Sequence, residues 1–266
     1  MSETPIRVLV VGAAGRMGRM VTAAVRAADG LEAVAGLDVA ELAPTVDLPC
    51  FATVAEAAAA AAPQVAIDFT HAAPARINLP ALIDAGISPV IGTTGLDAAE
   101  IEALDGRARA AGVSAFMAPN FAIGAVLMMR FAAEAARHFA FAEVIEYHHE
   151  NKRDAPSGTA VKTVEGMLAA RGAAFADTPV DEVETIAGSR GGAEGHIHIH
   201  SVRMPGFVAD QDVIFGGPGE HLRLSHRSID RSCFMPGVVL AARRVRHLPA
   251  GLTVGLETLL FGIDPA

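Results

Sequence analysis

The chain has 266 residues, a formal net charge of −9 and 52% hydrophobic residues. This length suits one large or two moderate domains, and we expect two. The negative charge gives no general attraction to nucleic acids or anionic membranes, and neither a signal peptide nor a long apolar run is visible, so we expect a cytoplasmic protein that binds neither.

The N-terminal part alternates short apolar strands with helices. Strands are predicted at 6–11, 31–38, 65–70, 88–94 and 113–119, with helices after the first strand and at 54–62, 75–86 and 98–112. The strands are rich in branched apolar residues, as is typical of strands buried on both faces. Regular alternation of this kind predicts an α/β fold with a Rossmann-like, doubly wound parallel sheet over residues 1–120.

The pattern changes after residue 120. A helix that is apolar on nearly all sides is predicted over 122–139, with Met128 and Met129 in the core. A strand at 142–149, a helix at 157–172 and strands at 196–204, 210–217 and 222–228 follow, and 188–195 has the composition of a mobile loop. We therefore expect a second, α+β domain with a mixed or antiparallel sheet over 121–236, followed by a segment, 237–266, that starts as a helix.

A glycine turn joins the first strand to the first helix. Gly12, Gly15 and Gly18 would let the backbone approach a pyrophosphate, although such spacing also occurs in purely structural turns. Asp38 ends the second strand, where an acid binds the ribose hydroxyls of a dinucleotide. No arginine follows Asp38 to hold a 2′-phosphate, so we expect NADH to be favoured over NADPH.

Two further segments, 92–95 and 118–124, follow predicted parallel strands, and 68–74 is a third. Open α/β sheets bind ligands at the carboxyl ends of their strands. Each segment alone fits a plain loop, but together with the glycine turn they predict a binding cleft.

The stretch EYHHENKRDAPSGTA, residues 146–160, contains His148, His149 and Lys152, one of two lysines in a chain with nineteen arginines. Lysine can give up a proton where arginine cannot, so this position suits a proton donor. A histidine pair is often only a solvated strand end. Here a lysine and a helix start lie beside it, which favours a functional site.

The helix start SGT offers an anion site. Ser157 can cap the helix, and the first amides at Gly158 and Thr159 are suited to a carboxylate. We expect Glu150, Arg153 and Asp154 to be solvated or structural companions of this block.

No metal site is expected. His196, His198 and His200 are predicted to share one strand face, but no carboxylate or cysteine completes a ligand set, so a polar or interface face is the simpler interpretation. Cys50 and Cys233 are isolated thiols without disulfide or zinc spacing.

Several motifs together resemble one known family over almost the whole chain. They are VVGAAGRMGR, IDFTH, VIGTTG, APNFAIGAV, EVIEYHHENKRDAPSGTA, HSVRMPGFVADQDVIFGGPGE and LSHRSIDRSCFMPGVVLAARRV. In this order they resemble the dihydrodipicolinate (4-hydroxy-tetrahydrodipicolinate) reductases of bacterial lysine and diaminopimelate biosynthesis.

The resemblance implies an NAD(P)H-dependent reduction of a cyclic dicarboxylate, with loss of water, giving tetrahydrodipicolinate. It implies that His148 is the acid/base residue and Lys152 the proton donor, with substrate bound by His149, Ser157, Gly158, Thr159 and Thr94. For the cofactor it implies Gly12, Ala13, Ala14, Gly15, Arg16, Met17, Asp38, Gly92, Thr93, Thr94, Ala118, Pro119, Asn120 and Phe121. It also implies a homotetramer built through the second domain's sheet, with the C-terminal segment packing back on the nucleotide domain.

The chain departs from the family pattern at Asp210, Asn151 and Arg153, none of which is a matched catalytic position. Two alternatives remain at this point. One is another two-domain nicotinamide oxidoreductase, such as an amino-acid or aldehyde dehydrogenase. The other is a nucleotide-sensing protein without catalytic activity, which would be expected to lose Lys152 or the SGT amides.

Overall fold

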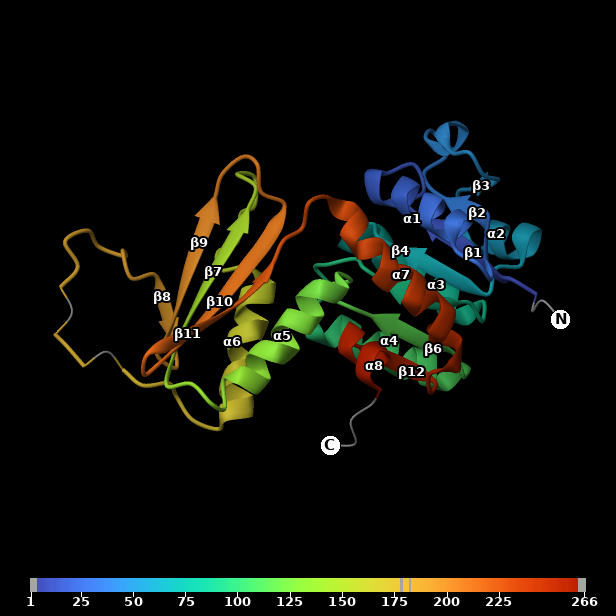
Figure 1. Cartoon of the computed structure of the whole chain (residues 1–266). Helices are drawn as coiled ribbons and strands as arrows, with labels where there is room; N and C mark the ends of the chain where they lie inside the picture. The colour runs from blue at the N-terminus through green and yellow to red at the C-terminus, as the bar shows by residue number, and fades with distance from the viewer. Residues whose placement is uncertain (1–3, 178, 182, 263–266) are drawn as a thin grey trace. The chain divides into compact units, whose positions relative to one another are not determined.

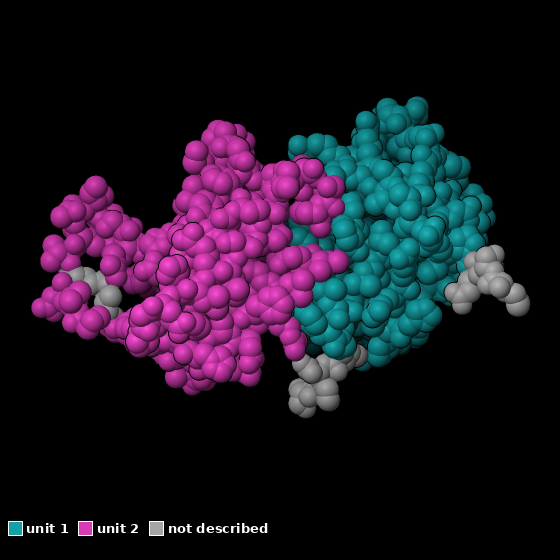
Figure 2. Space-filling model, in the orientation of Figure 1, with its two compact units in different colours: residues 1–122, 234–266 teal, residues 123–233 magenta. Residues whose placement is uncertain are grey.

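The computed structural model describes residues 4–177, 179–181 and 183–262. Contacts between Cα atoms divide the chain into two units, shown in different colours in Figure 2. Unit 1 comprises Met1–Ala122 and Phe234–Ala266, and unit 2 comprises Ile123–Cys233. Unit 2 is therefore an insertion in the sequence of unit 1.

Unit 1 is built on a seven-stranded parallel sheet with the order β12-β6-β5-β4-β1-β2-β3 (Figure 1). All of its strand pairs are parallel. The central strands are almost fully buried, as their apolar sequences predict. The strands are β1 (Ile6–Val11), β2 (Leu31–Leu37), β3 (Cys50–Phe51), β4 (Val65–Asp68), β5 (Ser88–Ile91), β6 (Ser114–Met117) and β12 (Gly251–Val254).

Helices pack on both faces of this sheet. One core cluster joins α2, α3 and α4 to the sheet, while α1 and α7 contact each other and α7 contacts β4 and β5. Thr53 with Glu56 and Asp97 with Glu100 form capping boxes that begin α2 and α4. The helices are α1 (Arg16–Ala27), α2 (Val54–Ala61), α3 (Ala72–Asp84), α4 (Ala98–Ala111), α7 (Met235–Arg244) and α8 (Leu256–Phe261).

Unit 2 is built on a five-stranded sheet with the order β11-β10-β7-β9-β8. Its β7 and β9 are parallel and its other pairs antiparallel, so the sheet is mixed. Its core gathers apolar side chains of the sheet with those of α5 and α6. The elements are α5 (Ile123–Ala135), β7 (Phe141–His148), α6 (Gly158–Arg171), β8 (Gly192–Glu194), β9 (Ile197–Arg203), β10 (Ala209–Gly217) and β11 (Glu220–His226).

The predicted fold class is confirmed, and so is the core position of Met128 and Met129. Several details differ. The predicted loop 188–195 contains β8, the C-terminal segment contributes strand β12 as well as helices, and β3 was not predicted. The strand predicted at 142–149 ends at His148, and His196, with a φ of 62°, precedes β9 instead of sharing its face with the other two histidines.

No helix in the described part of the chain has the length and apolar character needed to cross a membrane.

Candidate functional site

The turn between β1 and α1 has a backbone that only glycine fits at two positions. Gly12 has a φ of 73°, and its amide donates to the carbonyl of Leu37 at the end of β2, over 2.8 Å. A Cβ on Gly18 would lie 2.1 Å from the Gly12 carbonyl oxygen. The first turn of α1 is therefore held directly against the loop, with its amides at the carboxyl ends of β1 and β2.

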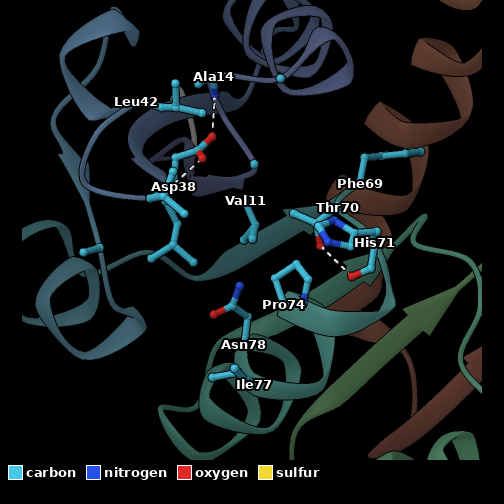
Figure 3. Close-up of a pocket in the computed structure, with 15 residues that line it drawn as sticks. Val11, Ala14, Asp38, Leu42, Phe69, Thr70, His71, Pro74, Ile77 and Asn78 are labelled. Atoms are coloured by element: carbon cyan, nitrogen blue, oxygen red, sulfur yellow. Dashed lines mark hydrogen bonds between the residues drawn. The ribbon is translucent and has the colours of Figure 1, made fainter.

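Asp38 follows β2 and closes this turn from the other side. Its Oδ2 accepts a hydrogen bond from the amide of Ala14 over 2.8 Å, and its Oδ1 accepts one from the amide of Val39 over 2.9 Å. The carboxylate is thus fixed beside the glycine turn, at one end of a pocket of about 560 Å³ (Figure 3). The pocket is lined by Val11, Gly12, Ala14, Gly15, Leu37, Asp38, Val39, Leu42, Ala52, Phe69, Thr70, His71, Pro74, Ile77 and Asn78.

A second pocket of unit 1, of about 200 Å³, lies at the ends of β4, β5 and β6. Phe69 lines both pockets. Its ring leaves no room for a side chain at position 92, since a Cβ on Gly92 would lie 2.2 Å from it, and it packs against Phe121 with ring centroids 5.4 Å apart. The lining comprises Met17, Phe69, Gly92, Ala118, Pro119, Asn120, Phe121 and Phe234.

Most of the expected cofactor residues line one of these two pockets, and four do not. These four are Ala13, Arg16, Thr93 and Thr94. Thr93 is buried, and its hydroxyl donates to Oδ1 of Asp68 over 2.7 Å. This hydrogen bond joins the segment after β5 to the end of β4.

The larger pocket is also lined by four residues of the segment 68–74, namely Phe69, Thr70, His71 and Pro74. They were not among the expected cofactor residues, although this segment was expected to border the cleft. Asp68 holds this segment in place, because its Oδ1 also accepts from the amide and the hydroxyl of Thr70 over 2.8 and 2.6 Å. Their position directly after a parallel strand was the sequence feature that could have identified them as binding residues.

In unit 2, the centre of the histidine and lysine block is a carboxylate that sequence reasoning missed. Glu146 is fully buried on β7, two residues before His148, and its Oε2 pairs with Nδ1 of His148 over 2.5 Å. Arg203, the neighbour of His148 on β9, donates from Nη1 to Oε2 over 2.9 Å and from Nη2 to Oε1 over 2.7 Å.

The charge of Glu146 is strongly stabilised. Burial by itself would raise its pKa, but hydrogen bonds from His148, Arg203 and Ser201 outweigh burial and lower the pKa to about 2. The group is therefore a carboxylate at neutral pH and can accept hydrogen bonds only. Since Glu146 and His148 are two residues apart on a strand, their shared face was the signal available from sequence.

Lys152 is paired with Asp154, which was expected to be a solvated or structural companion of this block. Its Nζ donates to both carboxylate oxygens of Asp154 over 2.8 Å each, and its side chain is 21% exposed. This hydrogen bond lowers the pKa of Asp154. The backbone amide of Lys152 donates to the carbonyl of His149 over 3.1 Å, which closes the turn between β7 and the loop.

The start of α6 has the expected cap. The hydroxyl oxygen of Ser157 accepts from the amide of Ala160 over 3.2 Å, and the amide of Ser157 donates to Oε1 of Glu146 over 3.3 Å. Gly158 is exposed, and a Cβ built on it would meet no heavy atom within 4 Å. The helix start is thus accessible, while Ser157 itself is buried.

His196, His198, His200 and the two cysteines form no comparable site among the described residues. His200 pairs with Glu143 over 3.0 Å, and His196 with Asp177 over 3.4 Å. Within the described residues, no group of three or more His, Cys, Asp and Glu side chains could hold a metal ion, and Cys50 and Cys233 are both free.

Asp210, which departs from the family pattern, lies on β10 and has a structural contact. Its Oδ1 accepts from the amide of Ser228 over 2.9 Å, and Arg227 lies 3.8 Å from its Oδ2. The adjacent Asp212 accepts from Arg227, Ser225 and Tyr147. These contacts are made near the end of β11, and of the histidine and lysine block they include Tyr147 but none of the hydrogen bonds of Glu146, His148 or Lys152.

Comparison with known proteins covers almost the whole chain. The family models described as dihydrodipicolinate reductase, N-terminus and C-terminus, match residues 6–121 and 124–260. A 4-hydroxy-tetrahydrodipicolinate reductase of Moorella thermoacetica is 44% identical over 264 residues, with 96% of this chain and 98% of the relative covered. One from Beutenbergia cavernae is 46% identical over 261 residues, with the same coverage.

Solved structures agree with these matches. The dipicolinate-bound dihydrodipicolinate reductase from Paenisporosarcina sp. TG-14 has a TM-score of 0.85 and 36% identity, with 96% of this chain and 99% of that chain covered. The amine dehydrogenase from Mycobacterium smegmatis has a TM-score of 0.61 at 13% identity, with 95% of each chain covered. The second likeness shows a shared fold alone.

Proposed function

The chain belongs to the dihydrodipicolinate reductase family, and on this premise we propose how its residues carry out the family's reaction. It is an NAD(P)H-dependent oxidoreductase that reduces 4-hydroxy-tetrahydrodipicolinate to tetrahydrodipicolinate, with loss of water, in lysine and diaminopimelate biosynthesis. The observation that carries the assignment of the site is that His148, the Lys152 loop and the start of α6 are all joined to Glu146 and Arg203 in unit 2.

The nucleotide-binding part of our proposal is residues 1–120, completed by 237–266, and the substrate part is 121–236. The two units support this division. The glycine turn fits a dinucleotide, because Gly12 and Gly18 allow a backbone that other residues would block and because the amides of α1 begin there. When bound, the nicotinamide supplies the hydride.

The residues proposed to hold the cofactor are those expected from the sequence. The pocket beside Asp38 supports a role for Gly12, Ala14 and Gly15, and the pocket beside Phe69 supports roles for Met17, Gly92 and the segment 118–121. Ala13, Arg16, Thr93 and Thr94 remain proposals without support from these pockets, and we add Phe69 and Thr70.

We favour NADH over NADPH as the cofactor. The carboxylate of Asp38 is fixed by two backbone amides beside the turn, so ribose hydroxyls can donate to it while a 2′-phosphate would meet its negative charge. Titration calorimetry with both cofactors tests this preference.

Proton transfer is assigned to unit 2. Nδ1 of His148 faces a carboxylate, which leaves Nε2 as the ring nitrogen available to a substrate. Lys152 carries protons on Nζ and donates to Asp154, and it would give one proton to the substrate ring, which gains negative charge when the hydride is added. His148 is thus proposed as the acid/base residue and Lys152 as the proton donor.

The substrate's carboxylate is proposed to bind at the start of α6. The amides of Gly158 and Thr159 lie at the positive end of the helix, and Ser157 retains a hydroxyl proton to donate. His149 and Thr94 are further proposed contacts. The dipicolinate-bound relative supports a dicarboxylate ligand of this size.

A coupled assay tests the function. Dihydrodipicolinate synthase makes the substrate, and the loss of nicotinamide absorbance is followed after the protein is added. Oxidation of the cofactor that depends on both the synthase and this protein is expected. If purified, folded protein oxidises neither NADH nor NADPH, the proposed reaction is wrong for this chain.

We also propose that the protein is a homotetramer assembled through the sheet of unit 2. One face of this sheet packs in the core with α5 and α6, whereas Ile145, Val202 and Ile214 belong to the opposite face and are partly exposed. Sedimentation equilibrium measures the assembly. A cytoplasmic location and the absence of nucleic-acid binding stay predictions.

A further inference from the structure

Glu146 joins three parts of the block that are separate in sequence. Its carboxylate accepts hydrogen bonds from the ring of His148 on β7, from the guanidinium of Arg203 on β9 and from the amide of Ser157 at the start of α6. The side chain of Glu146 is fully buried, so its carboxylate depends on these protein donors and not on water for its hydrogen bonds.

Arg203 extends the same connection to the loop that carries Lys152. Besides holding both oxygens of Glu146, its Nη2 donates to the backbone carbonyl of Asp154 over 2.8 Å, and its Nη1 donates to the carbonyl of Val202 over 2.8 Å. The side chain of Asp154 in turn holds Nζ of Lys152. A single buried ion pair therefore connects the proposed acid/base residue with the loop of the proposed proton donor.

We propose that Glu146 and Arg203 are positioning residues for the reduction, with Glu146 fixing His148 as the Nδ1–H tautomer and Arg203 fixing Glu146 against the Lys152 loop. This inference rests on the proposed function. Nε2 is then the nitrogen that faces the proton to be exchanged, and the carboxylate stabilises the ring when it becomes positively charged.

The hydrogen bonds of Arg203 also explain why position 146 has a glutamate and not a glutamine. A glutamine in place of Glu146 has one amide NH₂ group, and Arg203 donates to both oxygens of the native carboxylate. Either orientation of the amide would place its NH₂ against a donor of the guanidinium. The charge is needed for all the hydrogen bonds to be made at once.

The central experiment determines the tautomer of His148 by nitrogen NMR of ¹⁵N-histidine-labelled protein. A spectrum of His148→Gln assigns the signal, and spectra are taken at a pH where the ring is neutral. We expect Nδ1–H in the wild type and in Glu146→Asp, and loss of that preference in Glu146→Gln and in Glu146→Gln/Arg203→Met. An Nε2–H tautomer in the wild type overturns the proposal.

Kinetics provide the second measurement. We expect Glu146→Gln to lower kcat by about a hundredfold or more, the range for an impaired proton transfer, with little change in KM for NADH, and Glu146→Asp to recover part of the loss. Glu146→Gln leaves the partly buried guanidinium of Arg203 without a carboxylate partner, so the double variant Glu146→Gln/Arg203→Met, which removes both charges, is expected to restore folding. If the double variant folds and turns over at the wild-type rate, the pair is only structural and the proposal is wrong.

A matched control tests whether the loss of any buried carboxylate in this sheet has the same effect. Asp212→Asn also removes a buried carboxylate that pairs with an arginine, but Asp212 contacts Arg227, Ser225 and Tyr147 and, in the described part of the chain, makes no hydrogen bond to Glu146, His148 or Arg203. It is expected to lower Tm and leave kcat and the tautomer of His148 near wild type. The tautomer is measured without substrate, so a wild type that fails to turn over refutes the proposed function and leaves this inference to be decided by NMR.

Discussion

The substitution Gly158→Val is expected to weaken substrate binding without destabilising the fold. Gly158 begins α6, its φ is not in the left-handed region, and a Cβ there would meet no heavy atom within 4 Å. The fold therefore has room for the side chain, and removing a glycine reduces the freedom of the unfolded chain by about 0.4–1 kcal/mol. We expect Gly158→Val to keep or slightly raise Tm.

Binding should change in the opposite direction. The branched side chain would cover the amides at the start of α6 to which we assign the substrate's carboxylate. A hydrogen bond to a charged group contributes about 1.5–3 kcal/mol, so its loss corresponds to a roughly 10- to 150-fold weaker affinity. The expected changes are an increase of this size in KM and in the inhibition constant of pyridine-2,6-dicarboxylate, with unchanged affinity for NADH.

The assay is competitive inhibition by pyridine-2,6-dicarboxylate, measured with Tm for the same protein samples. Gly166→Val is the matched control, because Gly166 lies in the same helix, also has open space at its Cβ and is far from the helix start. The control should bind the inhibitor like the wild type. If Gly158→Val binds it equally well, the carboxylate site lies elsewhere and the role of the helix start is refuted.

Three other outcomes are expected. Asp38→Asn should reduce the preference for NADH over NADPH, measured as the ratio of the two dissociation constants, and an unchanged ratio would remove Asp38 from the specificity argument. His148→Ala and Lys152→Ala should each lower kcat about a hundredfold or more with NADH affinity retained, so wild-type turnover in Lys152→Ala would contradict a donor role. Glu146 has a pKa of about 2, below the ~4.3 of an unfolded chain, so its contribution of about 3 kcal/mol is present above pH ~4.3 and is lost as the pH falls toward 2. Urea unfolding of wild type and Glu146→Gln/Arg203→Met over this range measures it, and identical pH dependences would refute it.

The sequence predicted the parallel sheet well because its signals are local. Buried strands such as β1 and β4 are mostly apolar, and glycines or capping residues mark the turns between strands and helices. The missed strands are short: β3 has two residues, β8 has three and β12 has four, too few to show a clear alternation. They form because a neighbouring strand offers unpaired backbone groups, which is a non-local cause.

In the candidate site, too, the local features were predictable and the non-local one was not. His148, Lys152 and the cap at Ser157 lie in one short stretch, so their spacing in the sequence predicted that they lie together. Arg203 could not be predicted from spacing, because it reaches Glu146 only through the parallel pairing of β7 with β9.

The return of the chain to unit 1 has a consequence for synthesis on the ribosome. Strand β12 pairs with β6 at one end of the seven-stranded sheet, and α7 packs against α1, β4 and β5, yet both are translated after the whole of unit 2 (Figure 1). Until then β6 has an unpaired edge, of the kind that invites association with other chains. Unit 2, encoded by one continuous segment, is complete sooner. The domain begun first is thus finished last, and a nascent chain stalled before residue 235 exposes the edge of β6.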